Sequence, residues 1–96
     1  MNSTEQKRKS DALREIDRHF REIYPTQRYG KNECFLSSKG QIFRPFAFPG
    51  DNALAIEYAE TPDDAEKNLF EDGDRFYLSE LSISELFKAM VAEVEG

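Results

Sequence analysis

Near the start of the chain, apolar side chains recur at the spacing of one face of an α-helix. The side chains of this stripe are Leu13, Ile16, Phe20 and Ile23. Their spacing of three and four residues predicts an amphipathic helix. Ser10 can cap its amino end, and Pro25 ends it because a residue before proline is biased away from helical angles. Residues 3–9 contain no apolar residue, so we expect residues 1–9 to form a flexible or solvated arm. In an alternative interpretation the helix starts at Ser3, and residues 3–9 are then its solvated extension.

After residue 33 the pattern changes to the period of two that is typical of extended strands. It predicts three strands, at Cys34–Leu36, Gln41–Phe48 and Ala53–Ala59. The segments between them, residues 37–40 and 49–52, are rich in Gly, Ser, Pro and Asn and are expected to be turns. Pro45 lies inside the second strand and donates no backbone hydrogen bond. That strand is therefore expected at an edge of the sheet, or bulged at the proline.

A short helix is predicted after the third strand. Thr61 fits an N-cap, Pro62 fits the first helical position, and Asp63 and Asp64 fit the acidic first turn. We expect this helix to end near Leu69.

The residues that follow favour a turn at 71–74 and a fourth strand at Arg75–Leu78. In an alternative interpretation, Asp72-Gly73 forms the tip of a tight hairpin, and residues 67–71 form a strand instead of the end of the helix.

The final segment predicts a second long amphipathic helix. Ser82 and Glu85 have the spacing of a capping box. The apolar face that follows is formed by Ile83, Leu86, Phe87, Met90, Val91 and Val94. The predicted order is thus α-β-β-β-α-β-α. It indicates an α+β fold with an antiparallel sheet of three to four strands and helices packed on one face.

Length and composition indicate a single domain over residues 1–96. The chain is 39% hydrophobic and 33% charged, which is typical of a globular protein. Cys34 is the one cysteine, so no disulfide can form within the chain. The first residues lack the apolar core of a signal peptide, and no apolar run is long enough to cross a bilayer. We therefore expect a cytoplasmic protein that does not enter a membrane.

Charge is distributed unevenly along the chain. Residues 1–45 carry ten Lys and Arg against six Asp and Glu, whereas residues 46–96 carry three against thirteen. The chain as a whole has a net charge of −6. Since binding to phosphates needs clustered Lys and Arg, this balance makes nucleic acid an unlikely partner.

The basic residues of the first helix also favour a structural interpretation. Lys7, Arg14, Arg18 and Arg21 share one side of that helix, but acids lie beside them at helical spacing. The pairs expected from this spacing are Asp17–Arg21, Arg18–Glu22 and Glu15–Arg18.

No motif indicates an enzyme, a cofactor or a metal site. Cys34 and His19 could form a catalytic dyad only if the fold brought them together beside a third, orienting group. We interpret Cys34 as a small apolar strand residue and His19 as a surface partner of Glu15. Asp72-Gly73-Asp74 matches a fragment of a calcium-binding loop, but the flanking spacing does not fit.

The acidic block at residues 63–74 is the strongest functional candidate. The alternative interpretation is structural: a solvated turn and a helix N-terminus, where the helix dipole favours acids. Its carboxylates are Asp63, Asp64, Glu66, Glu71, Asp72 and Asp74. Glu93 and Glu95 add negative charge at the end of the last helix, where the helix dipole disfavours it and no structural benefit is evident.

We therefore predict a non-catalytic interaction or regulatory protein whose acidic block binds a basic protein. One such role is the inhibition of a nucleic-acid-binding protein by charge mimicry. Two alternatives remain. One is a small enzyme or ligand-binding module with a pocket between sheet and helices. The other is a homodimer that pairs through the open sheet face or the Pro45 strand.

Overall fold

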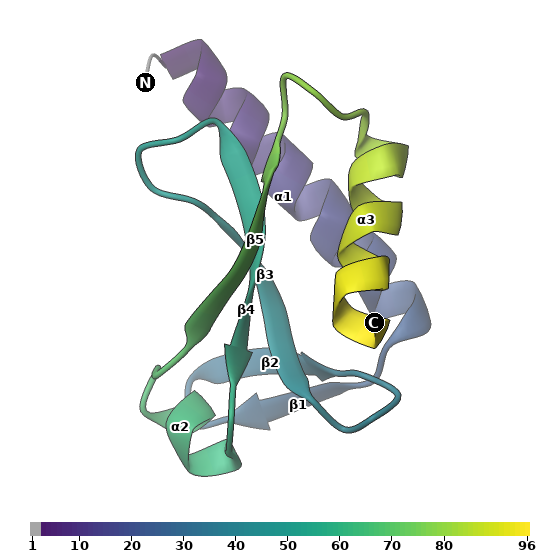
Figure 1. The fold of residues 1–96 in the computed structure, drawn as a ribbon. Helices are drawn as coiled ribbons and strands as arrows, with labels where there is room; N and C mark the ends of the chain where they lie inside the picture. Colours follow the sequence, from purple (N-terminus) through teal and green to yellow (C-terminus); the bar gives the residue numbers. More distant parts are fainter. Residues whose placement is uncertain (1–2) are drawn as a thin grey trace.

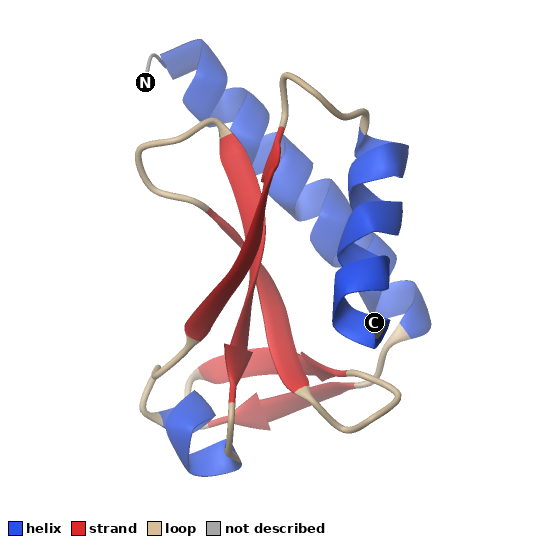
Figure 2. Cartoon of the chain, viewed as in Figure 1, coloured by secondary structure: helices blue, strands red, loops and turns tan. Residues whose placement is uncertain are grey.

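The computed structural model describes residues 3–96, which contain three helices and five strands (Figure 1, Figure 2). The helices are α1 (Ser3–Ile23), α2 (Pro62–Glu66) and α3 (Ile83–Glu95). The strands are β1 (Thr26–Tyr29), β2 (Asn32–Leu36), β3 (Ile42–Ala47), β4 (Ala53–Ala59) and β5 (Glu71–Tyr77). The fold class is α+β, as the pattern predicted. None of the described helices is long and apolar enough to cross a membrane.

The strands form one antiparallel sheet in the order β1-β2-β3-β4-β5, so each strand pairs with its neighbours in the chain. The sheet has one strand more than the three to four predicted. The additional strand is β1, whose residues are mostly exposed and polar. Pairing of Tyr29 with Asn32 leaves Gly30 and Lys31 as a two-residue turn, and Gly30 takes the positive φ of 60° that this turn requires.

The position of Pro45 differs from the expectation of an edge strand. Pro45 lies in β3, which is the central strand of the sheet. However, β2 pairs with β3 only at Ile42 and Phe43, so no strand lies beside Pro45 on that side. Pro45 pairs with Ile56 of β4 on the other side. At Pro45, β3 is therefore unpaired on the β2 side as an edge strand would be, and the missing N–H breaks no hydrogen bond between β2 and β3.

Two of the three helices cover one face of the sheet, and α2 lies against the other face. Helix α1 crosses β3 and β4, and α3 packs beside α1 over β4 and β5 (Figure 1). Helix α2 contacts β1, β2 and β4. There Ala65 of α2 packs in a small second core with Cys34, Ile42 and Ala59. The expectation of helices on one face is therefore wrong for α2, because alternate residues of β2 and β3 are apolar on both faces.

The main core lies between the sheet and the helices α1 and α3. Its fully buried large side chains include Ile16, Phe20, Phe43, Leu54, Ile56, Leu86 and Met90. Phe20 is central, since its ring contacts those of Phe35, Phe43 and Phe87 at centroid distances of 5.1–5.6 Å. The predicted helical stripe is thus buried at Ile16 and Phe20. It ends before Ile23, whose side chain is 55% exposed beyond the edge of the sheet.

Residues 3–9 belong to α1 rather than to a separate arm, and residues 1–2 lie outside the described part of the chain. Lys9 is buried, with 8% of its surface exposed. Its ammonium group donates hydrogen bonds to the backbone carbonyls of Phe48, at 2.7 Å, and Asp51, at 3.0 Å. This contact anchors the first turns of α1 to the loop between β3 and β4. The prediction missed it because residues 3–9 contain no apolar residue, and the anchor is a lysine.

The segment that leads into the last strand also differs from the prediction. Residues 71–74 are part of β5, with Glu71 opposite Tyr58 and Asp72 opposite Glu57 of β4. The predicted turn at these residues is therefore wrong, and so is the alternative hairpin at Asp72-Gly73. The pairing is irregular between Ala55 and Glu57, so the turn-like residues are accommodated in a locally disrupted strand.

Candidate functional site

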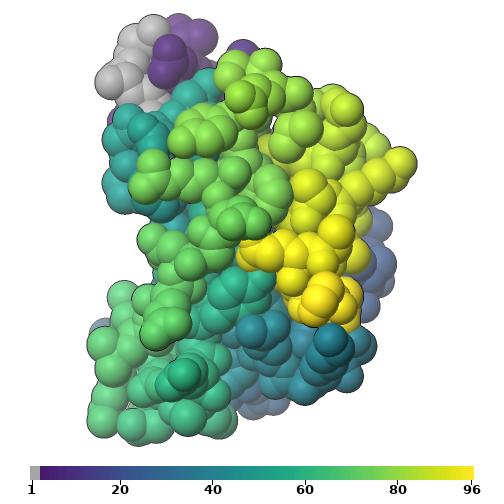
Figure 3. All heavy atoms as spheres, in the orientation of Figure 1, coloured from purple at the N-terminus to yellow at the C-terminus, as the bar shows by residue number. Residues whose placement is uncertain are grey.

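The acidic block of the sequence forms one end of the molecule, built by α2 and the first half of β5 (Figure 1, Figure 3). Helix α2 starts as the sequence predicted. Thr61 is its N-cap and accepts a hydrogen bond from the Asp64 backbone N–H at 3.1 Å, and Pro62 follows at the first helical position. Acids in the first turn are favoured by the helix dipole. Local helix chemistry therefore accounts for the positions of Asp63 and Asp64.

Helix α2 ends earlier than the predicted Leu69, in a motif that exposes an apolar side chain. Asn68 has φ 62°, and its N–H donates to the Ala65 carbonyl at 3.2 Å. The Leu69 N–H reaches back to the Asp64 carbonyl at 2.8 Å. These are the two hydrogen bonds of a Schellman motif, in which the residue at the position of Leu69 usually packs on the helix. Here Leu69 is 57% exposed among the acids.

Arg44 of β3 holds this end of the molecule against the sheet. Its guanidinium donates to Glu57 at 2.8 Å, to the side-chain oxygen of Asn32 at 3.2 Å and to that of Asn68 at 2.7 Å. It also lies over the ring of Phe70, 4.0 Å from the centroid. The planar fork of arginine suits such a junction. Arg44 therefore fixes the left-handed residue that ends α2, and its charge is matched by Glu57.

Two adjoining depressions lie at the end of β4 and the start of β5. The one of about 420 Å³ also touches residues 40–42 before and in β3, and the one of about 260 Å³ also touches α2 and the segment after it. They share Tyr58, Glu60 and Glu71, and one of them also includes Asp72 whereas the other includes Asp64. Apolar lining comes from Ile42, Leu69 and Phe70. We call these two depressions the acidic hollow. It combines carboxylates with a partly apolar floor, as a surface that binds both charge and an apolar side chain would.

The carboxylates of the acidic hollow are not held in ion pairs. Among the residues that the structure describes, Glu60, Asp64, Glu71 and Asp72 form no ion pair. Asp63 is paired with Lys67 at 3.0 Å. This pair raises the pKa of Lys67, chiefly through the hydrogen bond to Asp63. The charges of Asp64 and Glu66 also raise the pKa of Lys67, so this lysine offsets part of the charge of Asp64.

The structure brings three of the six predicted site residues together and separates the others. Asp64, Glu71 and Asp72 line the acidic hollow. Asp63 faces Lys67, and the stem of Glu66 lies against Gly30 in the turn between β1 and β2. Asp74 is farther along β5, where its backbone N–H donates to Glu93 of α3 at 2.9 Å.

Two further lining residues, Glu60 and Tyr58, were not singled out by the sequence. Glu60 directly precedes the cap of α2, so its charge and position in the chain could have included it in the acidic block. In the sequence, Tyr58 has the pattern of an ordinary strand residue. Its position in the hollow depends on the tertiary fold.

Glu93 and Glu95 have structural roles, contrary to the expectation that they bring no structural benefit. Besides the Asp74 N–H, Glu93 accepts a hydrogen bond from the Tyr58 hydroxyl. Burial raises the pKa of Tyr58, and this hydrogen bond raises it further. Glu95 accepts hydrogen bonds from the hydroxyl and the backbone N–H of Ser38. These bonds, with a contribution from Tyr24, lower the pKa of Glu95. The end of α3 is thus attached to the sheet by carboxylates.

The remaining candidates from the sequence occupy structural positions. Cys34 is 1% exposed in the second core, and burial raises the pKa of its thiol. The His19 ring packs at a tilt of 45° against that of Phe87, with a centroid distance of 5.2 Å, and lies 3.8 Å from Glu15. The described residues contain no cluster of metal-binding side chains.

The basic residues of α1 form ion pairs with neighbouring acids, as the helical spacing predicted. The pairs are Arg18–Glu15 at 2.7 Å, Arg21–Asp17 at 2.7 Å and Arg18–Glu22 at 3.7 Å.

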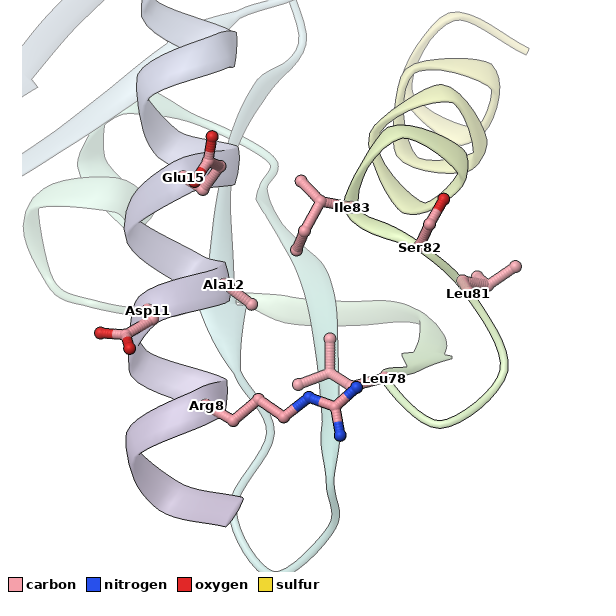
Figure 4. A pocket seen from close by; sticks show the side chains of 8 residues that line it. All are labelled: Arg8, Asp11, Ala12, Glu15, Leu78, Leu81, Ser82 and Ile83. Carbon is pink, nitrogen blue, oxygen red and sulfur yellow. The ribbon is translucent and has the colours of Figure 1, made fainter. Parts of the chain in front are cut away.

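A second depression lies between the first half of α1 and the segment that enters α3 (Figure 4). Its volume is about 390 Å³. Ala12, Leu78, Leu81 and Ile83 supply its apolar lining, while Arg8 and Ser82 are among its polar residues. We call it the α1–α3 groove. It shares no lining residue with the acidic hollow.

Comparison of the chain with protein-family models, with curated proteins and with solved structures finds no match.

Proposed function

We propose that this protein is a non-catalytic interaction protein whose acidic hollow binds a basic protein partner. The observation that supports the proposal is the set of four carboxylates, Glu60, Asp64, Glu71 and Asp72, that surround Tyr58 without an ion pair in the described part of the chain. A narrower form of the proposal is regulation by charge mimicry, in which these carboxylates occupy the phosphate-binding surface of a nucleic-acid-binding protein.

Electrostatics gives the physical basis of the proposal. Like charges held close together on a folded surface repel one another, and a basic partner relieves this repulsion while it gains attraction of its own. Complementary charge also speeds encounter and makes binding sensitive to salt. The exposed Leu69 beside the carboxylates offers an apolar contact that salt would not weaken.

The experiment compares two triple variants of the full chain that change the net charge equally. The test variant removes charge from the hollow with Asp64→Asn, Glu71→Gln and Asp72→Asn. The control variant removes charge from paired acids outside both depressions with Asp17→Asn, Glu22→Gln and Asp51→Asn. Each protein is immobilised and exposed to native lysate at low and at high salt, and retained proteins are identified by mass spectrometry.

We expect a basic protein that the wild type and the control variant retain at low salt and that the test variant loses. Equal loss from both variants would show that only total charge matters, and would argue against a site at the hollow. A partner that is retained equally at low and at high salt would also count against the proposal, and so would the absence of any retained protein. A retained protein that binds nucleic acid, and is displaced by it, would support the narrower form.

The α1–α3 groove favours a second candidate function, a ligand-binding module. A concave and partly apolar depression was the structural requirement for that alternative. The groove has a suitable size and lining, although it lies between two helices and not between the sheet and the helices as the sequence suggested.

A further inference from the structure

The α1–α3 groove has the composition of a binding site for a small amphipathic molecule. Its volume of about 390 Å³ falls in the usual range of ligand sites, which is roughly 300–1,000 Å³. Ala12 and Leu78 are 5% and 4% exposed and belong to the main core, so the floor of the groove is rigid. Ile83, at the start of α3, forms an apolar wall that is packed against the same core.

Arg8 differs from the other cations of α1. Lys7 and Arg14 pair with Asp11, Arg18 pairs with Glu15 and Glu22, and Arg21 pairs with Asp17 and Glu33. Lys9 is buried on backbone carbonyls. Arg8 forms no ion pair with any residue that the structure describes. Its side chain extends from α1 across the groove toward Leu78 (Figure 4).

The two acids at the rim do not neutralise Arg8. Asp11 is engaged by Lys7 at 3.2 Å and by Arg14 at 3.6 Å. Asp11 lines the groove together with Arg8, and Figure 4 draws its carboxylate turned away from the Arg8 guanidinium. Glu15 is engaged by Arg18 at 2.7 Å. The groove therefore has an apolar floor, one cation that forms no ion pair within residues 3–96, and two acids that are each paired along the helix.

We propose that the α1–α3 groove binds a small apolar carboxylate. The apolar body of this ligand lies on Ala12, Leu78 and Ile83, and its carboxylate accepts hydrogen bonds from the Arg8 guanidinium. An arginine can bind a carboxylate through two parallel N–H···O bonds, and such charge-assisted bonds are about twice as strong as neutral ones. The proposal does not rest on the acidic hollow, because the two sites share no residue.

The test uses three ligands with the same chain and different head groups: decanoate, decanol and decylammonium. Each is titrated below its micelle concentration into the isotopically labelled full chain, and binding is followed by NMR shifts of backbone amides. Decanoate is expected to bind best and to shift Ala12, Leu78 and Ile83. Equal binding of all three ligands, or shifts confined to other parts of the chain, would overturn the proposal.

Variants of Arg8 test the role of the charge. Arg8 is exposed, so its replacement leaves the core intact. Arg8→Gln should weaken decanoate binding about tenfold, the usual effect of losing a charge-assisted hydrogen bond, and should leave decanol unchanged. Arg8→Glu should shift the preference to decylammonium. The matched control is Arg21→Gln, which removes a cation of the same helix whose partners, Asp17 and Glu33, do not line the groove.

A further ligand, a short peptide, tests whether the groove binds a small carboxylic acid or the carboxyl terminus of another protein. A short peptide that ends in leucine carries the same pair of groups, an apolar body and a carboxylate. If that peptide bound in the groove more tightly than decanoate and lost its binding on amidation, the proposal of a small-molecule ligand would be wrong. Weaker binding of the peptide than of decanoate would support it.

Discussion

The hydroxyl of Tyr58 in β4 donates a hydrogen bond to the carboxylate of Glu93, which lies in the last turn of α3. The other oxygen of Glu93 accepts the backbone N–H of Asp74 in β5 at 2.9 Å. One carboxylate thus connects α3 with two strands, and Tyr58 is held from the α3 side while it lines the acidic hollow.

This connection predicts a measurable loss of stability when Glu93 is truncated. Glu93→Ala should lower the free energy of unfolding by about 1–3 kcal/mol, since two donors lose their acceptor. Tyr58→Phe should cost about 1 kcal/mol. Urea unfolding of the two variants and of the double variant provides the measurement. The losses should not add, because both report one hydrogen bond. Glu80→Ala, at an exposed position, is the control; additive losses would contradict the connection.

Gly73 permits the close approach of Glu93 to β5. A Cβ atom at this position would collide with the Glu93 carboxylate. Gly73 does not have a positive φ, so backbone strain does not contribute to the cost of replacing it. We expect Gly73→Ala to reduce stability by about 1 kcal/mol, because the Glu93 carboxylate can move aside but then loses a hydrogen bond. In the background of Glu93→Ala the same substitution should cost much less. A cost that is equal in the two backgrounds would exclude the steric explanation.

Lys9 is expected to be the most sensitive charged residue of α1. Lys9→Met should cost about 1–3 kcal/mol, because it leaves the carbonyls of Phe48 and Asp51 without their donor. Lys7→Met, which removes an exposed pair with Asp11, should change stability by no more than about 0.5 kcal/mol. Thermal unfolding compares the two variants. Hydrogen exchange should also rise in the loop between β3 and β4 for Lys9→Met alone.

Arg44 should keep α2 folded against the sheet. Arg44→Lys keeps the charge but cannot reach Glu57, Asn32 and Asn68 together. Amide exchange should therefore accelerate at residues 62–70, while the main core keeps its protection. Arg75→Lys, in which a surface pair with Asp51 is altered, serves as the control. Unchanged exchange at residues 62–70 would show that α2 does not depend on Arg44.

Alkaline pH should destabilise the fold through Tyr24. Burial, together with a hydrogen bond to Glu95, raises the pKa of Tyr24 to about 12, whereas a tyrosine in an unfolded chain titrates near pH ~10. The folded state therefore holds this proton more tightly. Its contribution to stability is complete below pH ~10 and is lost as the pH rises toward ~12.

Unfolding free energies measured across this pH range, with tyrosinate absorbance, test the effect. Tyr24→Phe should unfold with a shallower dependence on pH in the same range. An identical dependence in the variant would assign the effect to other groups, among them Tyr58.

The elements that the sequence predicted well are those whose own residues carry the signal. The stripe of Ile16 and Phe20 and the capping box of Ser82 are properties of one helix, and the structure confirms both. Strand β1 has no such signal, because it is exposed and is held by pairing with β2. Strand β5 was mistaken at residues 71–74 because acids and glycine suit an edge strand as well as a turn.

The composition of the sequence revealed the acidic block. It did not reveal which of its carboxylates line the hollow and which make contacts elsewhere. Whether a carboxylate lines the hollow or pairs elsewhere depends on contacts between distant segments. Arg44 meets Asn68, Glu66 meets the turn at Gly30, and Glu93 meets β5. No periodicity along the chain encodes these contacts, so the sequence alone could not separate Asp64, Glu71 and Asp72 from the other acids.

The neighbour-to-neighbour order of the strands has a consequence for how the chain folds. Each pairing closes a short loop, and the entropy of loop closure grows with the length of the loop, so the sheet can assemble by successive local steps. The contact between α1 and α3 joins opposite ends of the chain and carries the largest closure cost. Packing of these two helices is therefore the step on which the folding rate should depend most.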